Sequence, residues 1–171
     1  GPFNGSLMDT DLASMNSFPL TQPYQSPPWN YQGTENVTNI PINVVDWVLV
    51  ELRGTNGHTM VSMNAFLSTQ GQLLSTTGTT GITAEVSAGY YSIVVKHRNH
   101  LAVMSAQPVA FTDYLVSYDF TTNANRYYGG SNAAVELEPG VWGMIAGDAD
   151  GDGEILAVDD SICTNQLGQT G

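Results

Sequence analysis

The sequence predicts a mostly β fold, an antiparallel β-sandwich that carries an extended N-terminal arm and a C-terminal acidic loop with a short helix. Three observations predict it: short apolar or alternating runs between turn residues, a first segment rich in proline and aromatics, and an acidic run near the C-terminus. They divide the chain into an arm over residues 1–43, a sandwich over residues 44–146, and a loop with a helix over residues 147–171.

The arm lacks a clear periodicity, apart from a weak helical pattern over residues 7–15. Prolines recur along it between five aromatic side chains: Phe3, Phe18, Tyr24, Trp29 and Tyr31. Disordered linkers are poor in aromatics, so we expect the arm to pack on protein. Its own domain and a neighbouring copy of the chain are the two alternatives.

The strands follow from residue 44 onwards. Residues 44–53 are apolar and β-branched on both faces, as in a central strand. Gly54-Thr55-Asn56-Gly57 then predicts a hairpin turn. The expected strands cover residues 44–53, 59–67, 73–74, 82–86, 90–98, 109–111, 115–120, 133–137 and 141–146. Many short strands between Gly-rich and Asn-rich turns indicate a sandwich.

Residues 148–159 match a twelve-residue calcium loop. Ca²⁺ prefers six to eight oxygen ligands, and such a loop supplies them from positions 1, 3, 5, 7 and 12, with a glycine at position 6 for the turn. Gly153 falls at position 6, and Leu156 at position 9 has no side-chain oxygen. The expected ligands are the carboxylates of Asp148, Asp150, Asp152 and Asp159 and the backbone carbonyl of Glu154.

Two features distinguish this loop from a typical EF-hand. Position 12 is Asp, where an EF-hand has the longer Glu, and a short helix is expected over residues 159–167 before Gly168. This segment resembles the first half of a dockerin type I repeat, over roughly residues 147–168. A dockerin has two loop–helix units, and this chain contains one of them. We expect Val158, Ile162 and Leu167 to form the buried side of the helix.

A second resemblance covers most of the chain. The runs VDWVLVELR at 45–53, KHRNHLAVMS at 96–105 and GDADGDG at 147–153, with Trp142, are similar to a module of secreted bacterial surface proteins that precedes a dockerin-like end. The resemblance implies large exported proteins assembled at the cell surface, and so an extracellular location. We expect the sandwich to be Ig-like or transthyretin-like.

The charge excludes several partners. The formal net charge is −12, with four Lys and Arg against sixteen Asp and Glu. Nucleic acid and anionic membrane surfaces need a basic partner, so neither is expected. No apolar run approaches the roughly 18 residues of a membrane span, so we expect no membrane insertion. The single cysteine, Cys163, excludes an intrachain disulfide.

Catalytic motifs are absent from the sequence: it has no nucleophile elbow and no phosphate-binding glycine loop. We therefore expect no enzyme. His97 and His100, with His58, are either metal ligands or hydrogen-bonded loop residues. Lys96 and Arg98 are expected to pair with acids such as Glu51 or Glu85.

The predicted function is that of an extracellular calcium-binding structural module that mediates protein–protein association at the cell surface. Copies of the chain itself are one possible partner, assembled into a fibre through the arm. The alternative is a carbohydrate-binding module of a larger secreted protein, with a polysaccharide as its ligand. In each adjacent tyrosine pair one ring is expected in the core, because neighbouring strand residues point to opposite faces. The candidate sugar platform consists of Trp29, Tyr31, Tyr90, Tyr91, Tyr127 and Tyr128.

Overall fold

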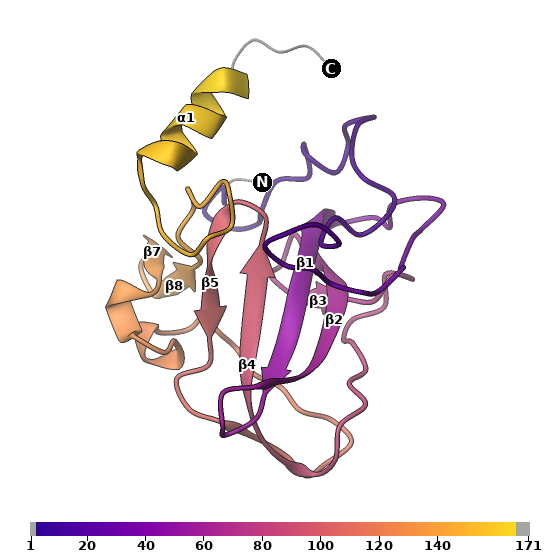
Figure 1. Cartoon of the computed structure of the whole chain (residues 1–171), viewed down its shortest axis with the longest axis vertical. Helices are drawn as coiled ribbons and strands as arrows, with labels where there is room; N and C mark the ends of the chain where they lie inside the picture. Colours follow the sequence, from indigo (N-terminus) through magenta and orange to yellow (C-terminus); the bar gives the residue numbers. More distant parts are fainter. Residues whose placement is uncertain (1–2, 167–171) are drawn as a thin grey trace.

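The computed structural model describes residues 3–166 and is mostly β, with antiparallel strand pairing throughout (Figure 1). The main sheet has the strand order β3-β2-β1-β4-β5, and β6 pairs with the start of β4. Its strands are β1 (Val44–Arg53), β2 (Thr59–Ser68), β3 (Leu73–Leu74), β4 (Gly89–His97), β5 (His100–Met104) and β6 (Val109–Phe111). The prediction of an antiparallel β fold is therefore confirmed.

Strand β1 occupies the centre of the main sheet, as its continuous apolar sequence predicts. Its side chains alternate between two separate apolar clusters. Trp47 and Leu49 belong to one cluster, whereas Val48 and Val50 belong to the other. The sheet therefore has a core on each face.

The N-terminal arm covers the Trp47 face of its own sheet. Tyr24 is 0% exposed and packs with Phe18, Trp47 and Phe66. Two hydrogen bonds fix the arm to β1: the Tyr24 hydroxyl donates to the Trp47 carbonyl at 2.8 Å, and the Trp47 indole N–H donates to the Pro19 carbonyl at 2.8 Å. Of the two alternatives, packing of the arm on its own domain is therefore the one observed.

The opposite face is covered by the segment that follows β6. Tyr127 and Ala134 are buried against Val48 and Val50, and Trp142 packs at the margin of this cluster. The segment contains two short 3₁₀ turns and a two-stranded sheet: η1 (Ala124–Arg126), η2 (Gly130–Asn132), β7 (Val135–Glu138) and β8 (Val141–Gly143).

Three predicted elements are wrong. Residues 7–15 form turns, in which the Asp9 carboxylate accepts the Asp11 N–H at 2.7 Å and competes with a helical backbone. Residues 115–120 and residues 82–86 are not strands. In residues 82–86, Ile82 and Val86 are half-buried between exposed neighbours. The alternation therefore indicates which side chains face the protein, but the segment is not paired with another strand in the described structure.

The C-terminal helix α1 (Ala157–Gln166) begins two residues earlier than residue 159. Its predicted buried side is only partly observed, because Ile162 is half-buried whereas Val158 is 57% exposed. The predicted helix end at Leu167 and Gly168 lies outside the described residues. Figure 1 shows α1 projecting away from the main sheet, which explains why Val158 finds no cover.

Candidate metal site

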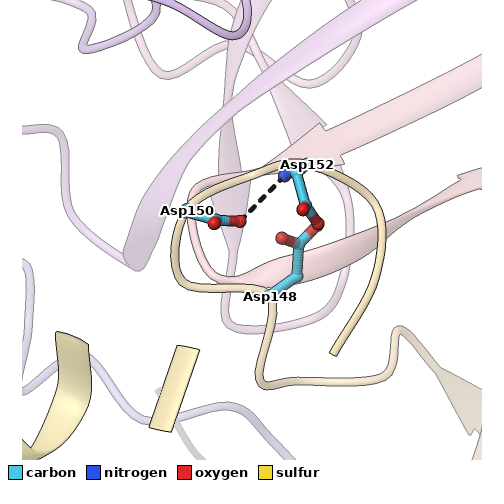
Figure 2. Close-up of side chains that lie close together, drawn as sticks. All are labelled: Asp148, Asp150 and Asp152. Carbon is cyan, nitrogen blue, oxygen red and sulfur yellow. Dashed lines mark hydrogen bonds between the residues drawn. The ribbon is translucent and has the colours of Figure 1, made fainter. Parts of the chain in front are cut away.

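Three carboxylates meet in the loop between β8 and α1. Asp148, Asp150 and Asp152 each offer one oxygen, and these oxygens all lie within 4.8 Å of one another. Figure 2 shows the three side chains pointing toward the middle of the loop. Their alternating positions in the sequence produce this convergence, because the loop curls around them.

Backbone geometry and local hydrogen bonds produce the curl. Gly151 and Gly153 have φ values of 75° and 93°, a left-handed region that favours glycine. The Asp150 carboxylate accepts the Asp152 N–H at 3.1 Å, and the Asp152 carboxylate accepts the Glu154 N–H at 2.8 Å. These side-chain-to-backbone bonds hold each turn of the loop.

Asp148 is the buried member of the cluster, with 3% of its surface exposed. Its Oδ2 accepts the Gly153 N–H at 3.2 Å, whereas within residues 3–166 its buried Oδ1 has no hydrogen-bond partner. Burial raises the pKa of Asp148, and the Asp159 and Asp152 charges raise it further, although backbone N–H groups oppose them. A cation against Oδ1 would satisfy this oxygen and offset the repulsion.

Asp159 fastens the loop to α1. Its Oδ1 accepts the N–H groups of Ala149 at 2.7 Å and Asp150 at 3.3 Å, and its Oδ2 accepts the Leu156 N–H at 2.8 Å. The Leu156 bond resembles the reciprocal half of a capping box at the start of a helix. These backbone donors, Leu156 first, lower the pKa of Asp159.

Asp159 does not belong to the group of three converging carboxylates in the described part of the chain. Its assignment as a metal ligand stays a prediction. The same holds for the backbone carbonyl of Glu154, whose side chain is exposed.

The donor set suits a hard cation. All three converging ligands are carboxylate oxygens, which Ca²⁺ and Mg²⁺ prefer, whereas softer metals favour imidazole and thiolate. The cluster can therefore hold a metal ion, and among residues 3–166 the buried Oδ1 of Asp148 has no hydrogen-bond partner that would compete with one.

The arm packs directly against this loop. A Cβ atom built on Gly151 would lie 2.8 Å from Trp29 Cζ2 and 2.9 Å from Pro28 Cγ. Trp29 in turn meets Tyr24 edge-on, with the ring centroids 5.3 Å apart. No local pattern in the sequence indicates this contact, because the two segments lie more than 100 residues apart in the chain.

A buried charge cluster lies at the end of β4. Asp46 is 1% exposed, and its carboxylate contacts Arg98 and, at 3.0 Å, Nε2 of His97. Burial raises the pKa of Asp46, but the His97 hydrogen bond and the Arg98 charge outweigh burial, so the pKa lies below its usual value. Arg98 thus pairs with Asp46, and the expected Glu51 or Glu85 partner is wrong.

Lys96 pairs with Glu51 as expected, at 2.5 Å, and Arg53 joins that carboxylate at 2.7 Å. The missed signal for Asp46 was its position within an apolar strand. A carboxylate buried there requires cationic or hydrogen-bonding partners. Nothing in the sequence states which of the basic residues supplies them.

The aromatic candidates divide as predicted. Tyr91 and Tyr127 are buried, at 8% and 3% exposed, whereas Tyr90 and Tyr128 are 61% and 65% exposed. One tyrosine of each adjacent pair therefore belongs to the core. The cysteine, Cys163, is exposed on α1.

No protein-family model matches the chain, and comparisons with curated proteins and with solved structures likewise gave no match. In the part of the chain that the structure describes, no helix has the length and apolar character needed to cross a bilayer.

Proposed function

We propose that residues 148–159 bind Ca²⁺ and that the chain is an extracellular structural module for protein–protein association at the cell surface. The observation that carries the proposal is the buried, unpartnered Oδ1 of Asp148 within a group of three converging carboxylates. Calcium is favoured over softer metals by the all-oxygen donor set, and over Mg²⁺ by the several carboxylates that converge in one loop, since Mg²⁺ is usually bound through one or two carboxylates. Free calcium is millimolar outside cells, which suits a loop of modest affinity.

The calcium acts as a structural clip in this proposal. An ion that binds the folded loop and not the unfolded chain stabilises the fold by RT ln(1 + [Ca²⁺]/Kd), about 2.7 kcal/mol at a hundredfold excess over Kd. We assign the loop–helix unit a static role, in which the ion stabilises the folded loop. The unit would correspond to the first half of a dockerin type I repeat.

Calorimetric titration with CaCl₂ tests the site. We expect one Ca²⁺ per chain, with binding abolished by Asp150→Asn. Asp160→Asn is the matched control, because Asp160 is exposed on α1 outside the converging group. A chain that binds no calcium at millimolar concentration, or Asp160→Asn as damaging as Asp150→Asn, would contradict the proposal.

The proposed partners are protein chains, including copies of this one that assemble into a fibre through the arm. The arm buries Phe18 and Tyr24 inward, so its outward side chains would make the contact. Five apolar ones are available there: Leu7, Leu12, Met15, Leu20 and Ile42, from 36% to 86% exposed. Apolar side chains left exposed on one segment are candidates for an association surface if they gather into a patch.

Size measurement by light scattering tests this association. Met15→Ser with Leu20→Ser should reduce the assembled fraction without unfolding the chain, because these side chains are 56% and 46% exposed and neither belongs to a core cluster. Leu115→Ser is the control, because Leu115 is 87% exposed and lies outside the arm. A wild-type chain that stays monomeric with and without calcium would remove self-assembly while leaving the calcium site intact.

We further propose that the main sheet and the β7–β8 sheet form the two layers of an Ig-like or transthyretin-like sandwich. The packing of Trp142 and Met144 against the Val48 cluster supports this arrangement. The role is binding and assembly, without catalysis, nucleic acid or membrane insertion.

A further inference from the structure

A pocket of about 200 Å³ lies beside the metal loop. Its walls come from three separate parts of the chain: the arm, the β4–β5 hairpin and the loop itself. The polar and aromatic side chains in its lining include Trp29, Lys96, His97, His100, Asp148 and Asp152. The volume equals roughly seven waters of liquid and lies below the range for drug-sized ligands. The pocket therefore has room for about one small ring.

The hydrogen-bond network fixes the proton on His100. His97 Nε2 lies 3.0 Å from the Asp46 carboxylate, which only accepts, so His97 donates through Nε2, and its Nδ1 accepts the Asn99 backbone N–H at 3.3 Å. His100 Nδ1 lies 3.0 Å from that Nδ1 and 2.6 Å from the Asn99 side-chain oxygen. With two acceptors facing it, His100 Nδ1 carries the proton, and His100 Nε2 presents a lone pair.

His100 is also neutral at physiological pH. Burial and the neighbouring His97 lower its pKa to about 4. Its ring can therefore accept a hydrogen bond from a hydroxyl, but it offers no positive charge to an anion.

A cation in the loop would keep open coordination positions. Asp159 already binds three backbone N–H groups, and Leu156 supplies no side-chain oxygen. With one oxygen from each of the three carboxylates and one backbone carbonyl, the ion would have four ligands, fewer than the six to eight oxygens that Ca²⁺ prefers. Oxygens from water or from a ligand in the pocket would complete the set.

The charge balance selects a neutral ligand. Three carboxylates against one divalent cation leave a net negative site. Lys96 and Arg53 share the Glu51 carboxylate, at 2.5 Å and 2.7 Å, and the Asp46 carboxylate contacts Arg98 and His97. Lys96 is the one Lys or Arg in the described lining of the pocket, and its ammonium is already bonded to Glu51, so a carboxylate or phosphate would meet the loop carboxylates with no unpaired ammonium beside it.

Trp29 supplies an apolar wall. Its ring is half-buried and fixed by the edge-on contact with Tyr24 and by the close approach of Gly151. An aromatic face beside hydrogen-bonding groups suits a ligand with both C–H and O–H faces.

We propose that this pocket binds one neutral monosaccharide unit, with vicinal hydroxyls on the loop cation, a hydroxyl donating to His100 Nε2, and the ring against Trp29. The proposal rests on the proposed calcium site. It assigns the sugar to a different surface from the exposed tyrosines Tyr90 and Tyr128.

Saturation-transfer NMR with methyl mannoside, methyl galactoside, methyl glucoside and fucose tests the proposal on the full chain. We expect at least one of these sugars to bind in CaCl₂, and its signal to disappear with excess chelator. His100→Ala should weaken that binding about tenfold, the loss of one hydrogen bond, while calorimetry shows calcium affinity unchanged. The matched control is His58→Ala, an exposed histidine outside the pocket.

The outcomes separate the two proposals. If calcium binds but none of the four sugars does at tens of millimolar, the pocket assignment is overturned and the calcium site stands. Sugar binding that survives the chelator, or equal binding by His100→Ala, also overturns it. Preference for glucuronate or sialic acid overturns the charge argument. A chain that binds no calcium refutes both proposals together.

Discussion

The hydroxyl of Tyr24 provides a sharp test of how the arm is attached. This side chain is 0% exposed, and burial raises the pKa of its hydroxyl, so it stays protonated and donates to the Trp47 carbonyl at 2.8 Å. Tyr24→Phe keeps the ring and removes the donor. A buried carbonyl that loses its partner costs about 1–2 kcal/mol, which for a chain of this length lowers Tm by about 2–8 °C.

Thermal unfolding followed by circular dichroism in excess chelator measures this loss free of any contribution from metal. Tyr128→Phe is the matched control, because Tyr128 is 65% exposed. If Tyr24→Phe has the same melting temperature as the wild type, the arm does not pack on its own sheet in solution. Exchange of the arm onto a neighbouring copy would then be the better description.

Three further predictions concern the loop and its surroundings. Gly151→Ala should lower the free energy of unfolding by about 1–3 kcal/mol more than Gly153→Ala does, as measured with denaturant. Both residues have positive φ, but only Gly151 contacts Trp29. Equal losses would show that the loop does not touch the arm. Because the pKa of His100 is lowered to about 4 from 6.5, the unfolded chain takes up its proton first as pH falls, so stability drops between about pH 6.5 and 4. His100→Gln should remove about 1–3 kcal/mol of that drop when measured with chelator, and an unchanged pH profile would contradict it. Asp148→Asn should lose the calcium-dependent rise in Tm, which is about 5–11 °C at a hundredfold excess over Kd. In chelator the variant should melt no lower than the wild type, because the raised pKa of Asp148 indicates that its charged carboxylate is unfavourable without metal. A lower melting point in chelator would show that this carboxylate stabilises the metal-free loop.

Local patterns predicted the parts of the fold that depend on neighbours in sequence. The apolar run of β1, the strong strand β4 and the carboxylate spacing of the loop all lie where the sequence places them. Each depends on a periodicity or a spacing within about a dozen residues. The same reasoning failed for residues 82–86, because a strand also needs a partner that no local pattern specifies.

Contacts between distant segments could not be predicted in this way. The Asp46–Arg98 pair depends on how β4 aligns with β1, and a register shift of one residue would move the side chains to the other face. The contact of Trp29 with Gly151 depends on the path of an arm without regular structure. The histidines and the metal loop line one pocket for the same reason.

The packing gives a physical reason to treat the loop and the arm as one unit. Gly151 contacts Trp29, Trp29 meets Tyr24 edge-on, and the Tyr24 hydroxyl bonds to the backbone of β1 at Trp47. Three contacts in series therefore join the carboxylate loop to the centre of the main sheet. A cation that holds the loop in its folded shape would hold the surface on which Trp29 rests, so part of its binding free energy would stabilise the arm. Since the outer side of that arm is the surface proposed for association, calcium removal should weaken assembly even though no ligand of the ion lies in the arm.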